Sequence, residues 1–313
     1  MKKNKKLLLK NSIMLKKIKN RLNHYISSVF KLSISDTIQV LKDKKEILFF
    51  HETGKIKNFG DDINPVLFEK LTGKSVVSKR KILNFREKKV YFFIGSILHN
   101  MKMSNVVVIG SGFINSEPKA YKKPKKIVAV RGALTRDIFL KNNIDCPEVY
   151  CDPALLLPFF FKNNNVNKKY DVGIIAHFAD KEILQKIIIE SEGLTYKIID
   201  ISSEQNQFIK DLCDCKTILS SSLHGVIVAH AYKIPALWIK LSDRLIGGSF
   251  KFNDYATSAG VKEMYCYNVD GILNLQTAVS KATLYNVKKS QNDLLLALKK
   301  ENLLLKGLES YIN

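Results

Sequence analysis

Continuous apolar runs punctuate the chain and predict strands that are buried on both faces. In the first half each run ends in Gly, Ser, Arg or an Asn-Phe-Gly turn, which predicts polar strand ends that gather at one edge of a sheet. Further runs of the same kind follow in the second half. Taken in chain order, the predicted strands cover residues 46–51, 90–96, 106–112, 127–132, 170–177, 195–201, 217–219 and 236–240. This pattern predicts an α/β protein.

The segments between the runs have helical periodicity or turn composition. Pro65 is expected to open a helix that Asp61 or Asp62 caps and Gly73 ends. A glycine-hinged loop is expected over residues 242–255. The other predicted helices cover residues 181–190, 206–213, 226–232 and a leucine-periodic segment from about 288 to 311.

An Asn-rich stretch over residues 162–169 predicts the linker between two halves, because it is polar and has no periodicity. The predicted division is a basic N-terminal segment over residues 1–40, an α/β domain over 41–165 and a second α/β domain over 166–313. The last of these ends in a packing helix.

Charge narrows the classes of ligand. The net charge is +22 over 313 residues, a balance that suits anionic small molecules, an anionic membrane surface or nucleic acid. No nucleic-acid-binding motif occurs, so nucleic acid is not expected as a partner. The five cysteines form no Cys-x-x-Cys pair, and the chain has no secretory signal. Reduced thiols and a cytoplasmic location are therefore predicted.

The first 35 residues hold ten Lys and Arg and no acidic residue, with apolar residues interleaved. One interpretation is a basic amphipathic helix on the inner face of the cell membrane, bound to anionic lipid. The alternative is a solvated leader that packs loosely on the first domain. The longest uncharged run in this segment is too short to span a bilayer.

The richest chemistry lies in residues 217–231, which predict a strand, a serine-rich turn and a helix. Backbone N–H groups and the helix dipole at such a turn favour an anion, so Ser221, Ser222 and Gly225 are candidate ligands. His224 lies at the helix start and can donate a proton. An ordinary capped helix with a core histidine accounts for the same pattern.

Other candidate residues follow strand ends. Arg131 is expected to be buried and to need an anion, and His177 ends the strand over residues 170–177. Carboxylates and amides bind hydroxyl groups, so the polar turn after the first strand is a candidate binding site. Its members are Asn58, Gly60, Asp61, Asp62 and Asn64. No metal-ligand spacing is visible, and no metal is expected.

Four stretches resemble the polysaccharide pyruvyl transferase family. They are Asn-Phe-Gly-Asp-Asp-Ile-Asn-Pro at 58–65, Val-Arg-Gly-Ala-Leu-Thr-Arg at 130–136, Cys-Asp-Pro-Ala at 151–154 and Ser-Ser-Leu-His-Gly at 221–225. The last stretch is similar to a short Ser-Leu-His-Gly subgroup that resembles the succinoglycan ketalase. Many members have Arg where this chain has Ser222, so another residue must supply that cation. Lys240, Arg244 and Lys251 are the candidates.

The resemblance implies two open parallel-sheet, Rossmann-like domains that face a cleft, as in glycosyltransferase-B folds. It also implies transfer of the enolpyruvyl group of phosphoenolpyruvate to a sugar or lipid-linked oligosaccharide, with no cofactor. His224 and Arg131 are then the expected catalytic residues. The donor would contact Arg131, His177, the serine turn and the three candidate cations. The sugar acceptor would contact the polar turn over residues 58–64.

Two other functions fit the same sequence. A glycosyltransferase of this fold would use a nucleotide sugar, and stabilisation by a nucleotide diphosphate would identify it. A non-catalytic protein of the same lineage would bind an anionic polymer or membrane through its basic face, an alternative that Ser222 in place of Arg keeps open.

Overall fold

The computed structural model describes residues 46–50, 58–78, 88–117, 122–163, 167–244 and 247–312. The predicted basic segment over residues 1–40 therefore lies outside the described residues. None of the helices in these ranges combines the length and the apolarity that a bilayer crossing requires.

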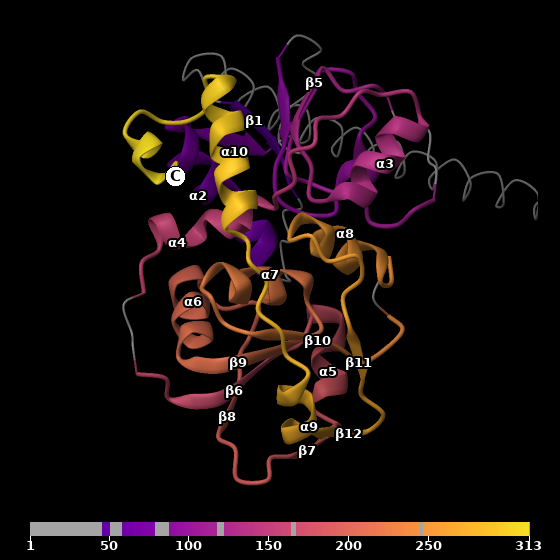
Figure 1. Ribbon diagram of the computed structural model, residues 1–313, viewed down its shortest axis with the longest axis vertical. Helices are drawn as coiled ribbons and strands as arrows, with labels where there is room; N and C mark the ends of the chain where they lie inside the picture. The colour runs from indigo at the N-terminus through magenta and orange to yellow at the C-terminus, as the bar shows by residue number, and fades with distance from the viewer. Residues whose placement is uncertain are drawn as a thin grey trace, which may run out of the picture.

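Two parallel five-stranded sheets build the two halves of the chain, which confirms the predicted α/β class (Figure 1). The first sheet has the order β2-β1-β3-β4-β5, and its register places Leu48 opposite Tyr91 and Tyr91 opposite Val107. Its strands are β1 (Glu46–Phe49), β2 (Val76–Ser78), β3 (Val90–Phe92), β4 (Val106–Ile109) and β5 (Lys126–Ala129).

The second sheet has the order β11-β10-β9-β6-β8, and its register places Gly173 opposite Ile218 and Leu219 opposite Leu237. Its strands are β6 (Tyr170–Ile175), β8 (Tyr196–Ile198), β9 (Cys215–Ser220), β10 (Ala236–Lys240) and β11 (Cys266–Asn268). A separate parallel pair joins β7 (Ile188–Glu190) to β12 (Ile272–Asn274).

Helices connect and cover the strands. The first half contains α2 (Phe59–Thr72), α3 (Ala133–Lys141), the 3-10 helices η2 (Leu98–Asn100) and η3 (Pro153–Leu156), and α4 (Leu157–Phe160). The second contains η4 (Phe178–Asp180), α5 (Lys181–Leu184), α6 (Gln205–Cys213), α7 (Leu223–Ala231), α8 (Phe250–Ser258), α9 (Leu275–Ser280), α10 (Lys288–Lys300) and η5 (Leu308–Tyr311).

Several predicted limits were wrong, among them the helix from about 288 to 311, which ends at Lys300 as α10. Helix α2 begins at Phe59, so Pro65 lies inside it and neither aspartate is its N-cap. Helix α5 ends at Leu184, and the apolar residues that follow form the short strand β7. The predicted loop over residues 242–255 contains the start of α8, because its aromatic residues Phe252 and Tyr255 are buried on one face of a helix.

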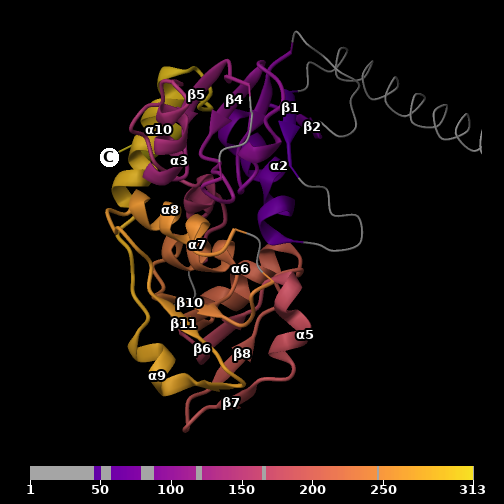
Figure 2. The same cartoon turned by 90° about the vertical axis from the view of Figure 1, so that its right-hand side faces the viewer.

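The two halves share one apolar core. Phe59 of α2 lies against Phe208 of α6, with ring centroids 4.3 Å apart. Helix α10 follows the second half in sequence but lies beside the first half (Figures 1 and 2). There Gln291 donates a hydrogen bond to the Leu155 carbonyl, and Glu301 pairs with Lys126 at 2.8 Å. The chain thus crosses between the halves more than once.

A buried ion pair connects the halves as well. Arg131 follows β5 of the first half, Asp254 lies on α8 of the second, and both side chains have no exposed surface. The Arg131 Nε donates to the Asp254 carboxylate at 2.9 Å, and the same carboxylate accepts from the Thr135 backbone and hydroxyl at 2.7 Å each. Neighbouring Gly132 has no room for a side chain, because a Cβ would lie 1.6 Å from the Asp254 carbonyl oxygen.

We expect Asp254→Ala to lower the free energy of unfolding by about 3–5 kcal/mol, because it leaves the guanidinium of Arg131 buried and unpaired. Urea titration followed by circular dichroism measures this change. Asp243→Ala removes an exposed partner of Lys240 and should leave the free energy of unfolding nearly unchanged. Equal costs for the two variants would contradict the importance of the buried pair.

Candidate active site

The start of α7 meets the start of α2 at His224. A Cβ added to Gly60 would lie 2.1 Å from the Nδ1 atom of His224, so the imidazole ring occupies space that any larger residue at position 60 would fill. The His224 side chain retains 14% exposure. Gly60, predicted to form a tight turn, instead lies inside the first turn of α2 and gives the ring its place.

The surroundings of His224 disfavour its charged form. Burial, together with smaller effects of Arg131, Lys251 and His177, lowers the pKa of His224 to about 3. The free protein therefore holds a neutral imidazole at neutral pH. Its Nε2 atom lies 3.9 Å from Asp152 Oδ2. Asp152 caps η3 through Oδ1, which accepts from the Ala154 backbone N–H at 3.0 Å.

The serine turn is held together by its own hydrogen bonds. Ser221 donates to Asp180 Oδ2 at 2.7 Å and accepts from the His177 backbone N–H at 2.9 Å. Asp180 Oδ1 in turn accepts from Ser242 at 2.6 Å. The Ser221 hydroxyl is thus a fully buried structural group that joins the ends of β6 and β9, which revises its predicted role as an anion ligand.

The other two turn residues have structural tasks as well. Ser222 is the N-cap residue of α7, and its backbone N–H donates to Ser220 Oγ at 3.0 Å. Gly225 lies against the same hydroxyl, where a Cβ would come within 2.3 Å. The turn fixes the entry to α7, and helix geometry leaves the N–H groups of its first turn without intrahelical acceptors.

Lys251 lowers the pKa of both His177 and His224, and His177 lowers that of His224, so the three residues form one electrostatic group. The backbone N–H of Ala179 donates to His177 Nδ1 at 3.2 Å, which leaves Nε2 as the other ring nitrogen. Burial lowers the pKa of His177 to about 4, with Lys251 adding to the effect. The structure thus brings together two of the predicted donor ligands with the predicted proton donor.

Lys251 is a nearly buried cation. Its side chain belongs to α8, the residue is 8% exposed, and burial lowers its pKa to about 8, with Arg131 adding to the shift and Asp180 opposing it. Within the described ranges its ammonium has no ion pair, and its recorded contact is with the Phe252 ring at 5.6 Å from the centroid. A buried ammonium without a counter-ion is a strong candidate for binding an anion.

The remaining predicted cations lie elsewhere or are occupied. Lys240 pairs with Asp243 at 2.6 Å and lines a separate pocket of about 290 Å³, and Arg244 is exposed on the following loop. Arg131 has no exposed surface, and besides Asp254 its nitrogens donate to Ser96 Oγ and the Phe113 carbonyl. The anion that the sequence predicted for Arg131 is therefore Asp254, and the structure revises its predicted contact with the donor.

The predicted acceptor residues separate into two groups. Asn64 is fully buried, and its amide donates to the Ile94 carbonyl at 2.9 Å and accepts from the Ile94 N–H at 3.3 Å. It thus joins α2 to the end of β3, and its predicted contact with an acceptor stays a prediction. Asn58 donates to Asp61 at 3.0 Å, and both lie half-buried with Asp62 at the start of α2.

Sequence reasoning missed two carboxylates. Asp180 holds Ser221 and Ser242 in place, and Asp254 binds Arg131. The only feature of the sequence that pointed to Asp180 was its position three residues after His177, which ends a predicted strand. Within the described residues no group of three His, Cys, Asp or Glu side chains has the arrangement of a metal site.

Comparison with known proteins identifies relatives of this chain. A sequence family described as polysaccharide pyruvyl transferase matches residues 37–243. The uncharacterized protein L143 of Acanthamoeba polyphaga mimivirus is 29% identical over 276 residues, which cover 85% of this chain and 93% of the relative. The succinoglycan biosynthesis protein ExoV of Rhizobium meliloti (strain 1021) is 30% identical over 214 residues, covering 65% of this chain and 62% of ExoV.

The pKa of Lys251 predicts how anion binding depends on pH. Sulfate, whose charge is constant between pH 6 and 10, should bind with nearly constant affinity below about pH 8. Its affinity should weaken as pH rises further, because Lys251 then loses its proton in the free protein. Calorimetric titration measures this affinity.

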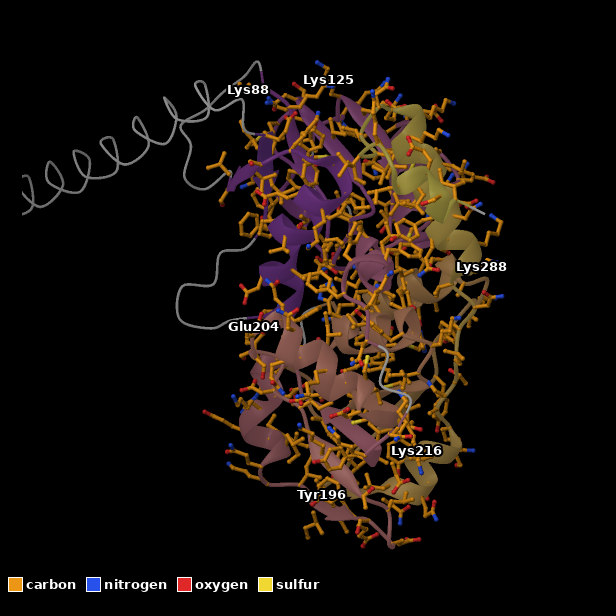
Figure 3. All side chains as sticks on the ribbon, turned by 90° about the vertical axis from the view of Figure 1, so that its left-hand side faces the viewer. Lys88, Lys125, Tyr196, Glu204, Lys216 and Lys288 are labelled. Atoms are coloured by element: carbon orange, nitrogen blue, oxygen red, sulfur yellow. The ribbon has the colours of Figure 1, made fainter. Side chains whose placement is uncertain are left out.

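Two variants make the test specific. Lys251→Arg should keep sulfate binding up to pH 10, and Lys251→Met should weaken it about 10-fold or more at pH 7. Lys216 lies near the far end of the second half (Figure 3) and pairs with Asp171, so Lys216→Met should bind sulfate normally. A pH profile that Lys251→Arg leaves unchanged would contradict the assignment.

Proposed function

This chain belongs to the polysaccharide pyruvyl transferase family, and we propose that it transfers the enolpyruvyl group of phosphoenolpyruvate to a sugar, forming a pyruvate ketal. The acceptor is a sugar of a surface polysaccharide or of its lipid-linked precursor. The observation that carries the proposal is the nearly buried, unpaired ammonium of Lys251 in one group with His177 and His224. This group suits a small, strongly anionic donor that requires protonation.

Lys251 is the cation that takes the place of the arginine found in many family members at position 222. Its ammonium binds the carboxylate or the phosphate of the donor. The N–H groups in the first turn of α7 provide further donors, with the positive end of the helix dipole behind them. His177 Nε2 completes the anion site from the end of β6.

His224 supplies the proton. A bound donor brings negative charge beside the imidazole, which raises the pKa of His224 from its low value in the free protein. The imidazolium then protonates the methylene carbon of phosphoenolpyruvate, and positive charge develops on the adjacent carbon. A sugar hydroxyl attacks that carbon, a second hydroxyl displaces phosphate, and the ketal ring closes. One of the two hydroxyl protons returns to solvent, which supplied the proton on His224, and the other protonates the phosphate.

The acceptor binds at the start of α2. Asp61 and Asp62 belong to its first turn, which Gly60 places directly against His224. Carboxylates accept hydrogen bonds from sugar hydroxyls, so these residues orient the hydroxyl pair toward the donor carbon. Arg131 acts at a distance, because its pair with Asp254 holds the helix that carries Lys251. The scheme uses no cofactor, and we place it in the cytoplasm.

We expect the protein to release phosphate from phosphoenolpyruvate only when a suitable pyranoside or lipid-linked acceptor is present. His224→Gln should lower kcat by about 10²–10⁴-fold, because it removes a general acid. Lys216→Met should retain wild-type turnover. Phosphate release is measured with a coupled colorimetric assay over a panel of acceptors.

The same panel separates the alternatives. If no acceptor supports phosphate release, and a nucleotide diphosphate but not phosphoenolpyruvate raises Tm, the donor assignment is wrong and a nucleotide-sugar transferase is indicated. Unchanged turnover in His224→Gln would instead contradict the role of His224 as the proton donor.

A further inference from the structure

Two buried polar atoms face each other across the two halves of the molecule. Asp152 belongs to the first half, has no exposed surface and caps η3. Its second carboxylate oxygen, Oδ2, lies 3.9 Å from His224 Nε2. Both atoms are buried, and in the described ranges neither has a hydrogen-bond partner. An unpaired buried polar atom costs free energy, so this pair calls for a functional explanation.

The cap of η3 does not account for the second oxygen. The Ala154 N–H requires one acceptor, which Oδ1 supplies at 3.0 Å. Serine or asparagine could cap the same turn without burying a charge. Burial of Oδ2 therefore has a desolvation cost that capping does not offset. The ring nitrogen of His224 that approaches this oxygen is Nε2, at 3.9 Å.

We propose that Asp152 is a positioning residue for His224, whose Oδ2 keeps the proton of the neutral ring on Nε2 and stabilises the imidazolium. This inference rests on the proposed function. With Nε2 protonated toward Asp152, the proton that is transferred must occupy Nδ1, the ring atom beside Gly60 and the start of α2. Nδ1 takes this proton from solvent when the donor binds and gives it to the methylene carbon, and the ring returns to its neutral form.

The charges around the ring make such a partner necessary. Arg131, Lys251 and His177 all oppose the protonation of His224. Asp152 is the carboxylate that approaches its Nε2 atom. Burial raises the pKa of Asp152 to about 6, an increase that Arg131 limits and Asp254 favours, so the carboxylate is ionised above neutral pH. A negative charge next to Nε2 offsets the effects of Arg131, Lys251 and His177 in the step that needs an imidazolium.

Asp152→Asn tests the proposal with little change of shape. Asparagine Oδ1 can still cap η3, and its NH₂ group then faces His224 Nε2 and requires a lone pair there. The proton of the neutral ring should move to Nδ1, which ¹⁵N chemical shifts of the imidazole report directly. The same exchange of tautomer underlies the loss of activity when the aspartate of a serine-protease triad becomes asparagine.

The expected results separate positioning from mere capping. In sulfate-saturated protein at pH 8, wild-type His224 should carry its proton on Nε2 and Asp152→Asn should carry it on Nδ1, with signals assigned from His224→Gln. The kcat for phosphate release should fall about 100-fold or more, and the pH below which His224 is protonated should be lower. Tm at pH 8 should be unchanged or higher, because a buried charge has been removed.

Two further variants complete the test. Asp152→Ser retains a capping oxygen and removes the carboxylate, so it should also lower kcat and lose the preference for Nε2. Asp214 is another buried aspartate, paired with Lys169 at 2.8 Å, and Asp214→Asn should leave the His224 tautomer and kcat unchanged.

The outcomes distinguish this inference from the proposed function. One outcome would overturn the role of Asp152 alone. In it, His224→Gln abolishes turnover, whereas Asp152→Asn keeps kcat within twofold of wild type and leaves the His224 tautomer unchanged. A change of tautomer in a wild-type protein that never releases phosphate from phosphoenolpyruvate would overturn the proposed function and leave the positioning role supported. A merely structural Asp152 would lower Tm and leave the tautomer unchanged.

Discussion

The buried pair of Arg131 and Asp254 is the interaction on which the arrangement of the two halves depends. Its two charges have no exposed surface, so each is stable inside the protein only while the other is present. The Asp254 carboxylate also accepts hydrogen bonds from the backbone and hydroxyl of Thr135. Arg131 donates hydrogen bonds through all three of its side-chain nitrogens. These contacts fix helix α8 against the end of the first sheet.

The Arg131–Asp254 pair also determines the geometry of the candidate active site. Asp254 and Lys251 lie on the same helix within one turn of each other, so the ion pair also sets the position of the ammonium. On the opposite side, Gly60 brings the start of α2 against His224. A proton donor, an anion-binding cation and polar acceptor groups thus come from three helices that belong to different halves of the chain.

The electrostatics of the site are those of an anion-binding enzyme before its substrate arrives. Burial and mutual repulsion lower the pKa values of His177, His224 and Lys251 together. An incoming anion reverses each of these effects, because negative charge favours the protonated form of every group in the cluster. Under the proposed function, the anion that binds therefore also prepares the proposed proton donor, and Asp152 is proposed to direct that proton to one ring nitrogen.

Local sequence alone determined the longer parallel strands, the turn before α7 and several of the candidate residues, because apolar runs and glycines act over a few neighbouring residues. It did not predict the short strands β2, β7, β11 and β12. Only the tertiary structure decided what those residues do. Arg131 meets an aspartate 123 positions away, Asn64 binds the backbone of Ile94, and Lys251 rather than Lys240 or Arg244 joins the histidines. Helix α8 was missed for the same reason, since its apolar face is recognisable only against Trp238 and the core that it covers. Contacts between distant segments depend on how the two sheets pack, so they cannot be predicted from local periodicity.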